Sequence, residues 1–149
     1  MVGNEEADFI IRTTLVKKTS RRDVLNRISA RNRRRIRKIT HMRQRGCKCE
    51  ICGIECAIEP TIGRPSIYSF DFHHLKPHMK RFKISKPPSD VRPFEVEIEL
   101  AKCILVCSFC HDQIEFNNYT VPEYFFQRSK IWLEQLSERY ADFLNDTYL

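Results

Sequence analysis

The chain has 149 residues, of which 42% are hydrophobic and 30% charged, and its net charge is +7 at pH 7. This length suits one compact domain with a flanking helix or arm and argues against two full domains, and the composition excludes a disordered or collagen-like chain. No apolar run approaches the roughly 20 residues of a membrane span, and residues 1–6 do not resemble a secretion signal. We therefore expect a cytoplasmic protein, associated with the nucleoid and without membrane contact.

The positive charge is concentrated in one segment. Residues 1–45 contain 14 Lys/Arg and 4 Asp/Glu, a net charge of +10, whereas residues 46–119 and 120–149 have net charges of −1 and −2. Such a dense basic segment indicates contact with a polyanion, and DNA is the expected partner. The alternative is a basic helix that only faces solvent. The expected phosphate contacts are Arg31, Arg33, Arg34, Arg35, Arg37, Lys38, Arg43 and Arg45, followed later in the chain by Lys80 and Arg81.

The N-terminal third predicts a long helix. Residues 9–16 could form a short strand, and Ser20 followed by Asp23 then resembles a capping box. Apolar residues recur at near-helical intervals from Leu25 to Met42, and Gly46 is suited to end a helix. We expect one basic helix over residues 21–45.

The remaining elements are shorter. Residues 66–73 alternate apolar and polar side chains, which predicts a half-buried strand that ends at two histidines. Residues 76–93 predict a loop, residues 95–106 fit either a helix or a strand, and a short helix is expected from about residue 111. Thr120 is a candidate N-cap for a last helix, whose aromatic and leucine side chains at 125, 132, 136, 140 and 143 share one apolar face.

Seven cysteines favour metal thiolates over disulfides, because their number is odd and no secretion signal precedes them. Two C-x-x-C pairs, Cys49/Cys52 and Cys107/Cys110, are separated by 54 residues. Two such pairs supply the four sulfur ligands of a tetrahedral structural Zn²⁺ site. Cys47 and Cys56 are alternative ligands, while Cys103 is expected to be a small buried side chain. Redox dithiols are the competing interpretation.

Three histidines lie beside these features. His73 and His74 close the predicted strand, and His111 directly follows Cys110. Two adjacent histidines at a strand end, with a third fixed next to a metal knuckle, indicate a second functional site.

The order of these motifs resembles the zinc-containing branch of the HNH, or ββα-metal, endonucleases. It runs from C-x-x-C-G through the segment Phe72–Pro77 to the segment Leu105–His111, and the similarity covers about residues 46–116. The Phe70–His74 and Glu99–Cys103 segments are similar to a subset with a His-His pair. The resemblance implies an α+β fold with a small zinc-stapled ββα core over residues 46–119, a basic N-terminal part over 1–45 and an amphipathic C-terminal helix over 120–149.

The resemblance also implies roles for individual residues. His74 matches the general base, whereas His73 and His111 match ligands of a catalytic divalent cation, Mg²⁺ or Mn²⁺. Glu115, one helical turn after His111, is a further candidate ligand, and Asp71 could orient His73. A neutral imidazole would take a proton from water while the cation neutralises charge on the phosphate, leaving 5′-phosphate and 3′-hydroxyl ends.

One position departs from the family pattern. Lys102 stands nine residues before His111, where the family has an asparagine that orients the base. This departure favours an alternative function, a non-catalytic zinc-stabilised DNA-binding module. A cysteine-based redox or metal sensor is a third interpretation, resting on Cys47, Cys56 and Cys103. For the endonuclease or nickase, phage or mobile-element biology fits the small size, and a homodimer would suit double-strand cutting.

Overall fold

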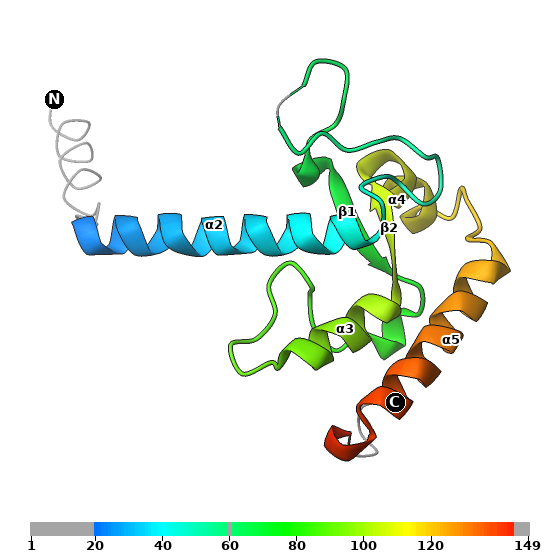
Figure 1. The fold of residues 1–149 in the computed structure, drawn as a ribbon. Helices are drawn as coiled ribbons and strands as arrows, with labels where there is room; N and C mark the ends of the chain where they lie inside the picture. Colours follow the sequence, from blue (N-terminus) through cyan, green and yellow to red (C-terminus); the bar gives the residue numbers. More distant parts are fainter. Residues whose placement is uncertain (1–19, 60, 145–149) are drawn as a thin grey trace, which may run out of the picture. The chain divides into compact units, whose positions relative to one another are not determined.

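The computed structural model describes residues 20–59 and 61–144, so the strand expected over residues 9–16 lies outside the described part. The described residues form an α+β fold with four α-helices and one two-stranded sheet (Figure 1). In chain order the elements are α2 (Arg21–Gln44), β1 (Phe70–His74), α3 (Pro93–Ala101), β2 (Cys103–Cys107), α4 (Ser108–Glu115) and α5 (Glu123–Arg139). None of the described helices has the length and apolar character needed to cross a membrane.

The chain divides into two units, Met1–Arg35 and Ile36–Leu149, and the division falls inside α2. It therefore lies before the expected boundary at residue 45. The second unit contains the sheet, α3, α4 and α5 together.

Helix α2 begins as predicted. The Asp23 backbone N–H donates to Ser20 Oγ at 3.1 Å, and the Ser20 backbone N–H donates to Asp23 Oδ2 at 3.2 Å. These reciprocal bonds satisfy donors that helix geometry leaves unpaired in the first turn. Gly46 follows the helix with φ of +79°, a conformation that glycine adopts without a Cβ clash. The capping box and the stop are both confirmed.

The sheet pairs β1 with β2 in antiparallel register, from Phe70 opposite Cys107 to His74 opposite Cys103. Every residue of β2 is buried, whereas β1 is buried only at its two ends. The ambiguous segment 95–106 contains both types of element, most of α3 and most of β2. The strand predicted from residue 66 starts later, because residues 67–69 form a 3₁₀ turn in which Ser66 Oγ accepts from the Tyr68 backbone N–H.

The main core forms where the end of α2, the sheet and α5 contribute buried side chains, among them Met42, Phe70, Ile104, Leu105, Val106 and Phe125. A smaller buried cluster contains Ile84, Leu100 and Cys103. Phe70 lies in the main core and Phe72 packs against both clusters, so the apolar side chains of the alternating segment face the interior. Apolar burial at this crossing fixes the ends of α2, β1 and β2 relative to one another.

The last two helices differ in detail from their predictions. Helix α4 begins at Ser108, earlier than expected, and carries Cys110 as well as His111. Helix α5 has Pro122 at its N-cap position without a side-chain cap bond, so the Thr120 cap is wrong. The apolar face is anchored by buried Phe125, but Phe143 lies in a 3₁₀ turn beyond α5 and is 57% exposed. The predicted apolar face therefore extends beyond the end of α5.

Candidate metal centres

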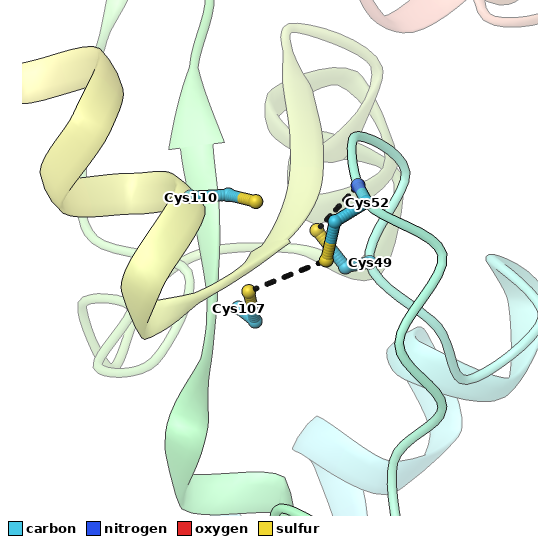
Figure 2. A group of neighbouring side chains, drawn as sticks. All are labelled: Cys49, Cys52, Cys107 and Cys110. Carbon is cyan, nitrogen blue, oxygen red and sulfur yellow. Dashed lines mark hydrogen bonds between the residues drawn. The ribbon is translucent and has the colours of Figure 1, made fainter. Parts of the chain in front are cut away.

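The four predicted zinc ligands converge from distant parts of the sequence. Cys49 and Cys52 come from the loop after α2, Cys107 ends β2 and Cys110 lies in the first half of α4 (Figure 2). Gly53, at φ of +77°, closes the first turn with a backbone bond to Cys49 O at 2.9 Å. Each cysteine offers a sulfur, and all four sulfurs lie within 4.8 Å of one another. We call these residues the four-cysteine cluster.

The geometry and chemistry of the four-cysteine cluster fit Zn²⁺. A Zn–S distance of about 2.3 Å places sulfurs at tetrahedral corners about 3.8 Å apart. The Cys52 and Cys107 Sγ atoms are 3.7 Å apart. Burial acts to raise the pKa of the Cys49 thiol, but hydrogen bonds from the backbone around Cys52 and Cys107 outweigh it and lower the pKa to about 7. The Cys49 thiolate is therefore accessible near neutral pH, whereas burial raises the pKa of the Cys107 and Cys110 thiols in the absence of a metal.

The other cysteines lie outside this cluster. Cys103 is 1% exposed and its Sγ donates to the Glu99 backbone carbonyl at 3.3 Å, while burial strongly raises the pKa of its thiol. It is the small buried side chain that the sequence predicted. Cys47 and Cys56 are joined through the backbone, where the Cys56 N–H donates to Cys47 O at 2.8 Å. Neither belongs to a group of potential metal ligands among the described residues.

A second group of potential ligands contains His73, His111 and Glu115, whose ligand atoms also lie within 4.8 Å of one another. Glu115 Oε1 is 3.4 Å from His73 Nδ1 and 3.6 Å from His111 Nε2. His73 comes from β1, whereas the other two are one turn apart on α4, which packs against both strands. We call these three residues the His-His-Glu cluster.

The His-His-Glu cluster is partly open to solvent. The side chains of His73, His111 and Glu115 are 12%, 31% and 54% exposed. Burial, followed by the nearby His111, lowers the pKa of His73, so its imidazole is favoured in the neutral form that binds metals. A cation held by these three ligands alone would keep further coordination positions open.

Asp71 does not take the orienting role expected of it. It precedes His73 by two residues on the same strand face but is exposed, and among the described residues no hydrogen bond joins its carboxylate to His73. His73 Nδ1 instead faces Glu115. Burial lowers the pKa of Lys38, and the charge of Asp71 opposes this shift by raising that pKa.

His74 lies next to His73 but in a different environment. It is 8% exposed, and its Nε2 is 2.7 Å from Glu99 Oε1. Glu99 is 1% exposed and also accepts from Lys102 Nζ at 2.9 Å and from the Arg81 backbone N–H at 2.8 Å. Burial would raise the pKa of Glu99, yet these bonds outweigh it and lower the pKa to about 2. The carboxylate is therefore ionised at neutral pH.

Glu99 is the residue that sequence reasoning missed. It lies in the Glu99–Cys103 segment that resembles the His-His subset, and its spacing to Lys102 places the two side chains on one face of a helix, but neither signal gave it a role. That spacing is common on solvent-exposed helices, and only the fold reveals that the pair is buried against His74.

The expected phosphate contacts differ in burial. Eight of them are exposed, namely Arg31, Arg33, Arg34, Arg35, Arg37, Arg43, Lys80 and Arg81. The backbone N–H of Arg81 also donates to Glu99. Lys38 is partly buried, with Nζ 5.9 Å from the centre of the Tyr68 ring. Arg45 is different, because its side chain is 10% exposed and donates to Leu100 O at 2.7 Å and Cys103 O at 3.3 Å. Its donors serve the fold, which corrects its assignment to DNA contact.

The described residues thus define an α+β protein whose four-cysteine cluster is positioned to hold a metal such as zinc. Comparisons with protein-family models, with curated proteins and with solved structures give no match for this chain. The function must be argued from the chemistry of the two clusters.

Proposed function

We propose that the protein is a metal-dependent HNH-type DNA endonuclease or nickase. The observation that carries the proposal is the His-His-Glu cluster with His74 as the next residue on the strand after His73. The arrangement of elements also supports it, because β1 and β2 are antiparallel and β2 leads directly into a helix that carries both Cys110 and His111. The four-cysteine cluster would brace this ββα unit with structural Zn²⁺, with four thiolates and no open coordination position.

The donor set of the His-His-Glu cluster suits a divalent cation. Two imidazole nitrogens and one carboxylate oxygen bind Mn²⁺ and related ions, and Mg²⁺ less readily. His73, His111 and Glu115 would hold the cation. Bound there, the cation would neutralise charge on the scissile phosphate and on the departing 3′ oxygen.

His74 is the proposed general base. Its neutral imidazole would accept a proton from the attacking water, which yields 5′-phosphate and 3′-hydroxyl ends when the P–O3′ bond breaks. This role is supported by sequence order, because His74 directly follows His73 on β1.

Exposed basic residues would hold the DNA. The exposed arginines of α2 and the exposed Lys80 and Arg81 offer donors to phosphate oxygens. Such contacts position a duplex without reading its sequence, so binding should weaken steeply as salt is added.

Lys102 favours a second candidate, a non-catalytic zinc-stabilised DNA-binding module. Its side chain occupies the place of the family asparagine, and it contacts Glu99 and Met79 O, at 2.9 Å and 3.0 Å. In this alternative the arginine-rich helix has the same role and the His-His-Glu cluster does not support cleavage.

Cleavage of supercoiled plasmid in Mn²⁺ or Mg²⁺ decides between the two. The zinc-loaded native chain is compared with His74→Ala, His73→Ala and, as a matched control, His78→Ala, which removes an exposed histidine of a nearby turn. We expect cleavage by the native chain and the control, and a loss of at least about 100-fold in the other two variants. DNA binding without cleavage by the native chain would favour the module instead.

A further inference from the structure

We propose that Glu99 is a positioning residue that fixes His74 in the tautomer with its proton on Nε2, and that Lys102 in turn fixes Glu99. The catalytic consequence rests on the proposed function, but the tautomer itself does not. The inference comes from a buried network of three side chains, His74 of β1, Glu99 of α3 and Lys102 directly after α3. Two backbone groups between β1 and α3, Arg81 N–H and Met79 O, complete it.

The Glu99 carboxylate is saturated with donors. Oε1 lies 2.7 Å from His74 Nε2 and 2.8 Å from the Arg81 backbone N, while Oε2 lies 2.9 Å from Lys102 Nζ. An ionised carboxylate has no hydrogen to donate, so the short contact with His74 requires a hydrogen on Nε2. In the neutral imidazole, Nδ1 then carries the lone pair and is the proton acceptor.

Burial makes this arrangement firm. Glu99, His74 and Lys102 are 1%, 8% and 6% exposed, so water does not compete strongly for their polar atoms. Lys102 Nζ also donates to Met79 O at 3.0 Å, which ties the lysine to the turn after the strand. Moving one side chain out of such a network would leave a buried polar group unpaired, at a cost in free energy. This cost holds each side chain in place.

Under the proposed function, this network would take over the role of the asparagine of the family pattern. Lys102 contacts Glu99, and Glu99 contacts His74, so the lysine orients the histidine through the carboxylate. A carboxylate that bonds one ring nitrogen selects the tautomer in which the other nitrogen is free to accept a proton.

The test reads the tautomer directly. The zinc-loaded chain is labelled with ¹⁵N-histidine, the His74 signals are assigned by their loss in His74→Ala, and ring ¹⁵N shifts are recorded without added Mg²⁺ or Mn²⁺ at a pH where the ring is neutral. We expect a protonated Nε2 and an unprotonated Nδ1 in the native chain. A proton on Nδ1 would overturn the inference.

Two variants separate positioning from packing. Glu99→Ala should lose the single tautomer, whereas Leu100→Ala, which removes a buried neighbour from α3 without a bond to His74, should keep it. An unchanged tautomer in Glu99→Ala would also overturn the inference. Where plasmid cleavage is measurable, Glu99→Ala should lower kcat at least about tenfold more than Leu100→Ala, with KM unchanged. A native chain that does not cleave refutes the proposed function and leaves the tautomer result standing.

Discussion

Cys52 Sγ lies 3.7 Å from Cys107 Sγ, although 54 residues separate the two cysteines in the sequence. The contact joins the loop after α2 to the end of β2, and Cys110 extends it into α4. A metal bound by all four sulfurs would therefore close a long loop and fix three elements at one point, which stabilises the folded chain against the unfolded one.

Loss of one sulfur should release the metal and unfold the second unit. Cys110→Ser replaces a buried ligand with a weaker one, so we expect less than one zinc per chain and a Tm lowered by ten degrees or more, on the order of the loss typical of structural zinc sites. The checks are zinc content by metal analysis and thermal melting. Cys47→Ser, outside the cluster, is the control and should keep its zinc. Unchanged zinc and melting in Cys110→Ser would refute a four-cysteine site.

Arg45 should matter for stability and not for phosphate contact. Its guanidinium lies 4.5 Å from the Trp132 ring and 3.6 Å from Glu50 Oε2, in addition to its two carbonyl acceptors. Arg45→Ala leaves a buried carboxylate and carbonyls with fewer partners, so we expect a loss of about 3 kcal/mol in the free energy of unfolding. Denaturant titration measures it, with exposed Arg43→Ala expected within about 0.5 kcal/mol of the native chain. Equal stability of the two variants would contradict the role assigned to Arg45.

Salt dependence should reveal the phosphate contacts of α2. The double variant Arg34→Ala/Arg35→Ala removes two exposed donors, and each lost phosphate contact lowers the slope of log K against log salt by about 0.9. We therefore expect a slope smaller by about 2 in fluorescence anisotropy with duplex DNA. Arg139→Ala, which removes an exposed arginine of α5, should leave the slope unchanged. A slope unaffected by the double variant would assign the basic helix to solvent.

Acid should weaken the fold through Glu99. Its pKa is about 2 in the folded chain, against an ordinary value of 4.5. The stabilisation is thus complete above about pH 4.5, and about 3 kcal/mol is lost as the pH falls from 4.5 towards 2. Glu99→Gln should show less of this acid loss and lower stability at neutral pH, while the exposed Glu134→Gln should follow the native curve. Urea titrations from acidic to neutral pH test this, and parallel curves for all three chains would contradict it.

Sequence patterns predicted the ends of α2 and the cysteine cluster better than they predicted the long-range contacts of individual side chains. The capping box and Gly46 set the ends of α2 because they act through bonds within a few residues. The cysteine spacing likewise identified the four residues that converge. Arg45 was misassigned because its acceptors, Leu100 O and Cys103 O, are 55 and 58 residues away and no local pattern indicates them. The role of Glu99 depends on β1 lying beside the end of α3, which only the tertiary structure supplies.

Glu115 provides the last test, because it contributes the only carboxylate of the His-His-Glu cluster. Glu115→Gln keeps the size of the side chain but removes its charge, so we expect at least about tenfold weaker Mn²⁺ binding, measured by calorimetry on the zinc-loaded chain. The two imidazoles should also make the native site bind Mn²⁺ more tightly than Mg²⁺. Asp112→Asn on the same helix is the control, since Asp112 lies outside the cluster. Equal Mn²⁺ affinity in Glu115→Gln and the native chain would remove Glu115 from the ligand set, whereas absence of binding in the native chain would refute the site itself.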